Sequence, residues 1–421
     1  MSPVATNTKR STYLLYRDLR GQAPEVVVKA EGSYLWLDDD RRILDACAGA
    51  AVASIGHGDT RIIQAVAAQM TSLSYHHTSR LTNPAAEALA KKLVGNKPGG
   101  LSHAIFLSSG SEANESAIKL ARQYHVERGE LDRVHIISRN NSYHGNSIGC
   151  VSLTGIPSRR RAFEPILMPH TSLGGAAAGN LTPVPGYFKA IRAVCDKHGV
   201  LLVLDEIMCG MGRTGRMHAW EWEGISPDIQ TIGKGLNGGY QPLSAVLMHQ
   251  KVYDALAAGS GAFANGQTFQ CHPAAAAAGL AVLSVFESDD IIANCSKRGE
   301  ELRAALINAI GSHAHVGEIR GRGLFLSIEF VLDRQTKATF PSQIQLSRLL
   351  DDAIFARGTS IYSGFGKGTA DGVRGDHILF SPPLNISSDQ VHEMVFATKE
   401  GVEEVFRLQE VQEAVASASR S

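Results

Sequence analysis

The stretch that decides the fold runs from Leu201 to Gly235 and reads LLVLDEIMCGMGRTGRMHAWEWEGISPDIQTIGKG. One apolar run in it ends in Asp205, and a second, shorter run ends in Lys234, which has a glycine on each side. Both runs are typical of buried parallel strands, because they are continuous and become charged only at their C-terminal ends. Ligands bind beyond the carboxyl ends of such strands. We therefore expect the acid and the lysine to face one crevice.

An aspartate and a lysine at one site suit a particular chemistry. A lysine amine can form a Schiff base with the aldehyde of pyridoxal phosphate, and an aspartate keeps the pyridine nitrogen protonated so that the ring accepts electrons. The flanking glycines leave the side chain of Lys234 open to a ligand. A surface lysine in a turn and an aspartate that caps a helix are the alternatives that this pair alone leaves open.

Composition bounds the class of protein. The chain has 421 residues, of which 44% are hydrophobic and 19% charged, as in a globular protein with room for a large and a smaller domain. A net charge of zero argues against nucleic-acid or membrane partners. The six cysteines include no C-x-x-C pair and indicate reduced thiols. The polar N-terminus has no apolar signal core, so we expect a cytoplasmic protein, with a mitochondrial location as the open alternative. We expect no metal site, because neither the cysteines nor the histidines have the spacing of metal ligands.

A second motif follows the apolar run at 103–107. Ser109, Gly110 and Ser111 open a helix that continues to about residue 127. Free N–H groups, hydroxyls and the positive end of the helix dipole converge at such a turn, so it is suited to bind an anion such as phosphate. A capping box formed by Ser111 with Asn114 or Glu115 is the alternative, and it is compatible with anion binding. Further on, a strand predicted at 134–138 leads to Tyr143, which is placed to stack on a planar ring or to pack in the core.

Taken in order, these motifs resemble the class III aminotransferases, which are pyridoxal-phosphate enzymes of fold type I. The resemblance covers roughly residues 30 to 410. It rests on SGSEAN at 109–114, YHG at 143–145, DE at 205–206, GRTG at 212–215, Lys234, and GQTF at 266–269.

The resemblance implies a role for each matching residue. Lys234 would form the Schiff base and shuttle the proton, and Asp205 would pair with the pyridine nitrogen. The ring would lie between Tyr143 and Ile207. The remaining cofactor contacts would come from Ser109, Gly110, Ser111, His144 and, from the neighbouring subunit of a homodimer, Thr268. Arg374 would grip a substrate carboxylate, although a plain surface arginine is the alternative.

The resemblance also implies the architecture and the reaction. The fold would be α/β, with a large domain built on a mostly parallel sheet of the seven-stranded type and a small α+β domain. We expect an N-terminal arm and part of the small domain at 1–58, the cofactor domain at 59–311 and the C-terminal part at 312–421. The enzyme would move an amino group from an amine or amino acid to a keto acid such as pyruvate or 2-oxoglutarate. A racemase or decarboxylase on the same fold is the alternative.

The chain departs from the family pattern between Tyr143 and Asp205. A helix and a central strand that the family carries are missing, and a Gly/Ala-rich piece at 174–179 stands near their place. Loss of a central strand leaves two edges with unpaired backbone groups. The hypotheses are an internal deletion or splice variant, or a sheet repaired by another segment. An inactive dimeric remnant is the alternative for the function.

A rival motif lies inside the opening stretch. Residues 210–215 match G-x-G-x-x-G after a strand, as in a dinucleotide site of an NAD-dependent oxidoreductase. The residues that follow do not form the pattern of a long amphipathic helix opening at the third glycine, which such a site requires.

Overall fold

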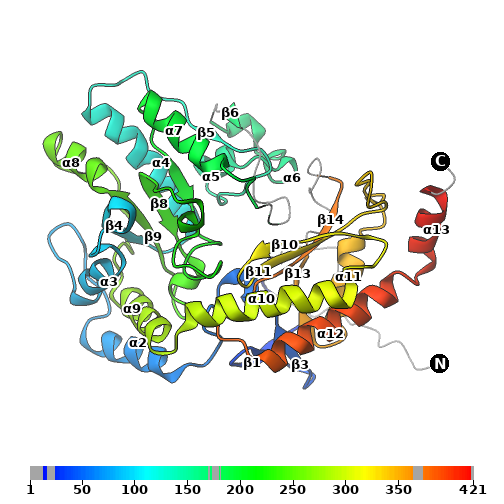
Figure 1. Cartoon of the computed structure of the whole chain (residues 1–421). Helices are drawn as coiled ribbons and strands as arrows, with labels where there is room; N and C mark the ends of the chain where they lie inside the picture. The colour runs from blue at the N-terminus through cyan, green and yellow to red at the C-terminus, as the bar shows by residue number, and fades with distance from the viewer. Residues whose placement is uncertain are drawn as a thin grey trace.

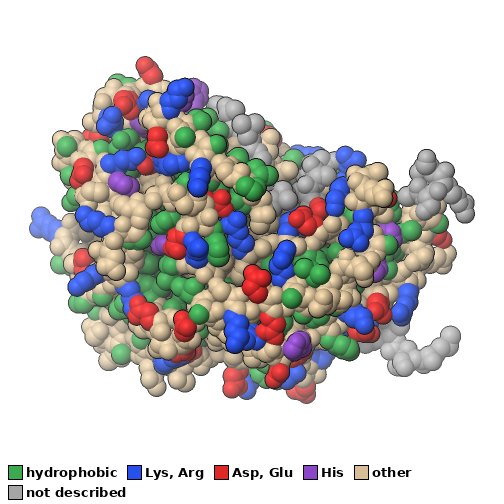
Figure 2. All heavy atoms as spheres, in the orientation of Figure 1, with side chains coloured by type: hydrophobic (Ala, Val, Ile, Leu, Met, Phe, Trp, Pro, Cys, Tyr) green, Lys and Arg blue, Asp and Glu red, His purple; other side chains and the backbone are tan. Residues whose placement is uncertain are grey.

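The computed structural model describes residues 13–16, 24–168, 171–172, 180, 182–363 and 373–418. Figure 1 shows the strands in two main groups, each with helices around it. Lys and Arg side chains are interspersed with Asp and Glu over the face in Figure 2, in line with the net charge of zero. In the described part of the chain, no helix is long and apolar enough to cross a membrane, and no three His, Cys, Asp or Glu side chains group as metal ligands.

The first group is a sheet of four strands. In order across the sheet they are β4 (Leu101–Leu107), β9 (Ser244–His249), β8 (Ile229–Ile232) and β7 (Val203–Asp205). β9 runs antiparallel to both of its neighbours, whereas β7 and β8 are parallel, so three of the four strands share one direction. The carboxyl ends of β7 and β8 therefore meet at one edge, with Asp205 at the end of β7 and Lys234 just after β8.

Helices cover both faces of this sheet, as the alternation of side chains along β9 requires. Ala245 and Leu247 belong to the apolar core shared with α3 (Pro84–Val94) and α9 (Pro273–Ser288). Val246 and Met248 belong to the core on the opposite face. That second core is formed with α4 (Gly110–Glu127) and α8 (Gln250–Ala258).

The remaining helices of this half are shorter or lie outside the two layers. α2 packs against α9. Their bounds are α1 (Ala48–Ala51), α2 (Thr60–Ser72), α5 (Ile148–Leu153), α6 (Pro157–Arg160) and α7 (Tyr187–His198).

The second group of strands is antiparallel. It contains β10 (Val316–Arg322), β11 (Phe325–Phe330), β14 (Asp376–Phe380) and β13 (Tyr362–Ser363) in that order. The long helices α10 and α12 cross beside it in Figure 1. The helices of this half are α10 (Ile291–Ile310), α11 (Leu346–Phe355), α12 (Ser388–Val405) and α13 (Gln409–Ala418).

An N-terminal sheet joins the two ends of the chain. Its strands are β1 (Val27–Glu31), β2 (Tyr34–Leu37), β3 (Arg42–Asp45) and β12 (Thr359–Ser360). β12 pairs with β3 in parallel, and Leu44 shares a core with Ile378 and Val411. The N-terminal strands therefore pack with C-terminal residues, as expected for a small domain built from both ends of the chain. The domain boundaries at residues 58 and 311 stay a prediction.

The main sheet is interrupted beyond β7. β5 (Ile137–Ser138) and β6 (Thr171–Ser172) form a separate parallel pair, and β7 has β8 as its one strand partner among the described residues. β7 and β5 each expose a large apolar side chain. Val203 on β7 is 38% exposed, and Ile137 on β5 is 71% exposed. The Gly/Ala-rich piece at 174–179 lies outside the described residues.

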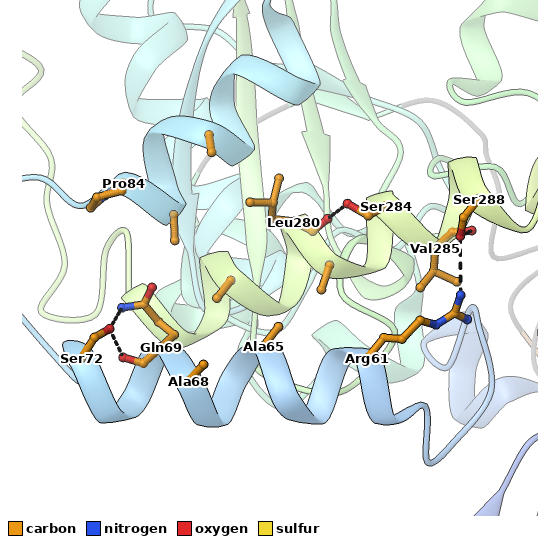
Figure 3. Close-up of a pocket in the computed structure, with 14 residues that line it drawn as sticks. Arg61, Ala65, Ala68, Gln69, Ser72, Pro84, Leu280, Ser284, Val285 and Ser288 are labelled. Atoms are coloured by element: carbon orange, nitrogen blue, oxygen red, sulfur yellow. Dashed lines mark hydrogen bonds between the residues drawn. The ribbon is translucent and has the colours of Figure 1, made fainter.

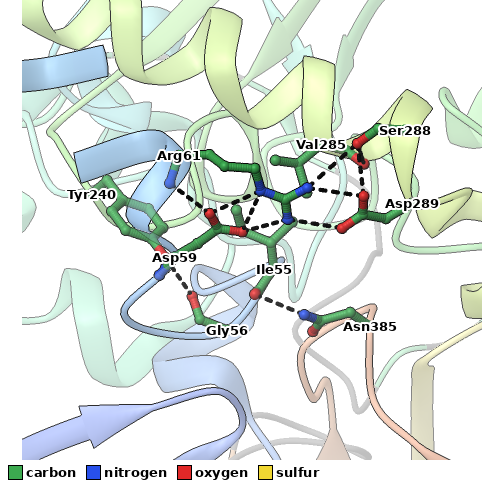
Figure 4. Close-up of polar contacts among 9 residues, drawn as sticks. All are labelled: Ile55, Gly56, Asp59, Arg61, Tyr240, Val285, Ser288, Asp289 and Asn385. Carbon is green, nitrogen blue, oxygen red and sulfur yellow. Dashed lines mark hydrogen bonds and ion pairs between the residues drawn. The ribbon is translucent and has the colours of Figure 1, made fainter. Parts of the chain in front are cut away.

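A polar cluster fixes the entry to α2 (Figure 4). Asp59 caps the helix by accepting from the backbone N–H of Arg61 at 2.9 Å. The guanidinium of Arg61 also pairs with Asp289, just after α9, at 2.8 Å. The hydroxyl of Tyr240 accepts from the backbone N–H of Asp59 at 2.8 Å and donates to the carbonyl of Gly56 at 3.3 Å. The loop before α2 is thereby tied to α9 and to the segment that follows Lys234.

Candidate cofactor site

Asp205 is held by three donors at the end of β7. The Nδ1 atom of His144 and the Nδ2 atom of Asn114 lie 2.7 Å and 2.9 Å from its Oδ2 atom. The backbone N–H of Ile207 donates to Oδ1 at 3.1 Å. Burial alone would raise the pKa of Asp205, but the hydrogen bonds with His144, Ile207 and Asn114 together hold that pKa below its usual value. The carboxylate is therefore charged at neutral pH.

Lys234 follows β8 at the first position of a short 3-10 turn (Lys234–Leu236). Its φ of 43° lies in the left-handed region, which non-glycine residues seldom adopt and which is frequent at functional sites. Burial lowers the pKa of the amine, while the negative charge of Asp205 opposes that effect. A lowered pKa increases the fraction of neutral, nucleophilic amine.

The N-terminus of α4 has a capping box, but it begins two residues before the predicted one: Ser109 and Glu112 form it, not Ser111 with Asn114 or Glu115. The Ser109 hydroxyl accepts from the backbone N–H of Glu112 at 3.2 Å, and the Glu112 carboxylate accepts from the N–H of Ser109 at 3.0 Å. The first N–H groups of a helix have no carbonyl partner within it, so those of Gly110 and Ser111 remain suited to an anion. The capping and anion-binding interpretations are thus compatible in this geometry.

Two glycines let neighbouring segments close on this helix end. A Cβ atom at Gly110 would lie 2.8 Å from the Cδ1 atom of Ile207, and one at Gly145 would lie 2.5 Å from the Oγ atom of Ser111. The Ser111 hydroxyl accepts from the backbone N–H of Asn146 at 3.0 Å and keeps its own proton to donate. Ile207, Gly110 and the 143–146 loop are thereby brought together.

The other predicted residues lie farther from this cluster or on its margin. Tyr143 is 41% exposed, and the guanidinium of Arg159 lies 5.0 Å from its ring centroid. Thr268 is exposed, and its carbonyl accepts from the Tyr75 hydroxyl at 3.0 Å. Arg374 is exposed just before β14. The described contacts of the single chain do not bring Thr268 to the other predicted residues.

The role of one residue of the cluster was not predicted from the sequence. Asn114 donates through Nδ2 to Asp205 and also to the carbonyl of His144 at 2.7 Å, and its Oδ1 atom accepts from the Thr231 hydroxyl at 2.7 Å. The signal that could have indicated it is a polar residue four positions after Gly110 and three before the buried Ala117, on one helix face with both.

A buried polar network lies beside Asp205 and was also not predicted. The Glu206 carboxylate accepts from the backbone N–H groups of Ala219 and Trp220 at 2.9 Å and 2.8 Å, and from Nε2 of Gln230 at 2.9 Å. Burial raises the pKa of Glu206 to about 7. This network ties the turn-rich segment after β7 to β8.

The segment after β7 also bears on the alternative of a dinucleotide site at residues 210–215. After residues 210–215 the chain forms turns and a short 3-10 helix (Ala219–Glu223), so no long helix opens at Gly215. A Cβ atom at Gly212 would lie 3.2 Å from Phe286, and one at Gly215 would lie 2.4 Å from Ser296. The glycines therefore allow close packing against α9 and α10, and the context that a dinucleotide site needs is missing from these described residues.

A groove between α2, α3 and α9 has a volume of about 770 Å³ (Figure 3). Alanines dominate its lining, with Leu280 and Val285, and Arg61 lies at one end. It contains none of the predicted cofactor residues, so it is separate from the cluster around Asp205.

The cluster fits pyridoxal phosphate. Oδ1 of Asp205 accepts one hydrogen bond and has capacity for a pyridinium N–H. Lys234 is an amine with a lowered pKa at the adjacent strand end. The N-terminus of α4, where Gly110 and Ser111 stand, suits the phosphate.

Comparisons with known proteins agree with this chemistry. A family model described as aminotransferase class-III matches residues 17–176 and 174–400. An uncharacterized aminotransferase of Schizosaccharomyces pombe is 38% identical over 437 residues, covering 93% of this chain and 95% of its own. An omega-transaminase structure from Thermomicrobium roseum is 31% identical with a TM-score of 0.84, covering 91% of this chain and 93% of its own. A PLP-bound amine transaminase from an uncultivated Pseudomonas species is 27% identical with a TM-score of 0.88, covering 94% and 100%.

The same comparisons locate the departure from the family pattern. The family model matches in two pieces that meet at residues 174–176. Because 93% of 421 residues is about 390, about 45 of the 437 positions aligned with the S. pombe relative have no counterpart in this chain. The break in the family match therefore lies between β6 and α7 in the sequence, within the region that the sequence predicts to be shortened.

Family, fold and cofactor chemistry converge. The expected resemblance is confirmed by the family match over most of the chain and by the structural neighbours. The chain belongs to the class III aminotransferases and is a pyridoxal-phosphate-dependent enzyme of fold type I that transfers amino groups.

Proposed function

We propose that Lys234 and Asp205 are the catalytic pair of this aminotransferase. The observation that carries the proposal is their placement after adjacent parallel strands, with Asp205 held anionic by three donors and the Lys234 amine shifted toward its neutral form. When bound, pyridoxal phosphate supplies an electron sink that stabilises negative charge at the substrate Cα. Asp205 holds a proton at the ring nitrogen, and Lys234 anchors the cofactor and moves the Cα proton.

The neighbouring residues would bind and orient the cofactor. Gly110 and Ser111 would donate to the phosphate from the first turn of α4, beside the Ser109 cap. Ile207 would cover one face of the ring and Tyr143 the other. His144 would support Asp205, as the 2.7 Å contact between Nδ1 and Oδ2 indicates.

We infer a homodimer in which Thr268 serves the neighbouring subunit. Thr268 is exposed, and the exposed rings of Tyr75 and Phe269 make an edge-to-face pair beside it with centroids 6.1 Å apart. Exposed aromatic pairs favour burial in an interface. The six free cysteines support a cytoplasmic location.

The substrates would be an amine or amino acid and a keto acid such as pyruvate or 2-oxoglutarate. The exposed Arg374 supports recognition of a carboxylate, because a guanidinium binds carboxylates through two parallel hydrogen bonds. Panels of amines with each keto acid would separate the reaction types. Equimolar formation of a new amino acid supports transamination, whereas inversion or CO2 release without a new amino acid supports a racemase or a decarboxylase.

The first experiment is cofactor trapping. Purified protein is incubated with pyridoxal phosphate, its visible spectrum is recorded, and borohydride is added before peptide mass analysis. We expect a visible band that borohydride removes and one cofactor mass on the Lys234 peptide. Lys234→Ala should lose both signals, and the surface variant Lys399→Ala should keep them. Soluble, cooperatively folded wild-type protein without a band would refute the proposal and favour the inactive remnant.

A further inference from the structure

We propose that Asn114 and Thr231 form a positioning pair that orients the Asp205 carboxylate toward the ring nitrogen of the cofactor. This inference rests on the proposed function and deepens it. Neither residue would touch substrate or reacting atoms, so both act through Asp205.

Asn114 uses both of its donor N–H groups and one oxygen lone pair at one junction. It is 5% exposed on α4, and its Nδ2 atom donates to Oδ2 of Asp205 at 2.9 Å and to the carbonyl of His144 at 2.7 Å. Its Oδ1 atom accepts from the Thr231 hydroxyl at 2.7 Å. Thr231 is fully buried on β8 and lies directly opposite Asp205 in the strand register.

The two acceptors decide which way the amide faces. The NH2 group of Asn114 must face the His144 carbonyl and Oδ2 of Asp205, because a turned amide would place its oxygen against both of these oxygens, which repel it. The Thr231 hydroxyl then donates to the amide oxygen on the other side. Thr231 therefore holds the Asn114 side chain in the position from which it donates to Asp205.

Asn114 in turn decides which carboxylate oxygen is available. Oδ2 of Asp205 accepts from both Asn114 and His144, whereas Oδ1 accepts only from the N–H of Ile207 among the described residues. Two donors on one oxygen resist rotation of the carboxylate. Oδ1 thus keeps capacity for a further donor, and the pyridinium N–H is the donor that the proposed function supplies.

The same helix then holds both ends of the cofactor. Gly110 and Asn114 are four residues apart on α4, about one turn and about 6 Å along the axis. The first would serve the phosphate and the second would set the carboxylate at the ring nitrogen. A shift of α4 would therefore move both contacts together.

The test compares matched substitutions. Thr231→Val removes the hydroxyl and keeps the shape, while Thr231→Ser keeps the hydroxyl. Thr398→Val makes the same exchange at a fully buried threonine of α12, whose hydroxyl donates to the Met394 carbonyl at 2.7 Å. For each protein, the affinity for pyridoxal phosphate is measured by equilibrium dialysis, and the pH midpoint of the visible band is measured by titration.

We expect Thr231→Val to weaken cofactor affinity about tenfold, as for loss of a buried hydrogen bond that leaves its partner unpaired, and to move the pH midpoint. Thr231→Ser and Thr398→Val should match wild type in both. Equal affinity and midpoint in Thr231→Val and Thr398→Val would overturn the inference. Cofactor trapping separates this failure from failure of the proposed function. If the wild type traps the cofactor at Lys234 and Lys234→Ala does not, the proposed function stands even when the inference about Thr231 fails.

A double-mutant cycle covers the case in which Thr231→Val alone does not fold. Asn114→Ala should weaken cofactor binding more than Thr231→Val, and the double variant should bind no worse than Asn114→Ala, because Thr231 acts only through Asn114. Thr231→Ser combined with Asn114→Ala should likewise equal Asn114→Ala alone. Additive losses in either combination would contradict the pair.

Discussion

We expect the buried His218 to lower the free energy of unfolding measurably as the pH falls. Its ring is 3% exposed and stacks on Trp220 with centroids 5.1 Å apart. Its Nδ1 atom lies 3.0 Å from Nε2 of Gln230, which identifies Nδ1 as the acceptor of a neutral ring. Burial lowers the pKa of His218 from 6.5 to about 4. The substitution His218→Asn keeps an acceptor for Gln230 and removes the titration.

The sign follows from proton binding. As pH falls, the unfolded chain binds a proton at His218 near pH 6.5, whereas the folded chain resists it down to about pH 4. The unfolded state therefore gains protons first, and the free energy of unfolding falls through this window. A difference of 2.5 pKa units corresponds to about 3 kcal/mol. The stability contribution is complete above pH 6.5 and lost by about pH 4.

The assay is urea unfolding at fixed protein concentration between pH 4 and pH 7, for wild type and His218→Asn. All other titrating groups are common to both proteins, so the difference between their unfolding free energies isolates His218. We expect this difference to change by about 3 kcal/mol across the window. His392→Asn, with a side chain that is 66% exposed, is the control for exchanging the residue type alone. A difference curve for His218→Asn that is as flat as the control would refute the reasoning.

Three further predictions concern the backbone, a helix cap and the substrate. Gly323→Ala should lower the unfolding free energy by about 2 kcal/mol or more, because its φ is +55° and a Cβ would lie 2.6 Å from the carbonyl carbon of Thr214; an unchanged melting temperature would contradict this. Asp59→Ala should cost about 1 kcal/mol through loss of the α2 cap, measured by urea unfolding against Asp132→Ala as a surface control. Arg374→Ala should raise KM for carboxylate substrates about tenfold and leave amines without a carboxylate unchanged; an equal effect on both would remove Arg374 from the substrate site.

The parts of the site that were predicted from the sequence depend on local patterns. The start of α4 and the strand ends at Asp205 and Lys234 depend on neighbours within a few residues, so spacing alone indicated them, although the predicted cap at Ser111 lies two residues after the observed cap at Ser109. The strand expected at 134–138 is reduced to Ile137–Ser138, because strand length depends on pairing with segments elsewhere in the chain.

The interactions that sequence analysis missed are long-range. Thr231 and Asn114 are 117 residues apart, and their contact exists only once α4 has packed on β8. Nothing in the spacing of either residue identifies the other. Gln230 reaches Glu206 in the same way, from the neighbouring strand.

Mutations near the interruption of the sheet and mutations in the Asp205 cluster should affect the enzyme in different ways. Each described donor to Asp205 comes from α4, from the loop after β5, or from the turn after β7, and none comes from the shortened region near residue 175. Mutations in that region would therefore reach the enzyme through solubility and folding yield, since unpaired apolar edges invite association. Mutations in the Asp205 cluster would reach it through turnover. The donors that hold Asp205 would therefore be unaffected by sequence changes confined to the shortened region.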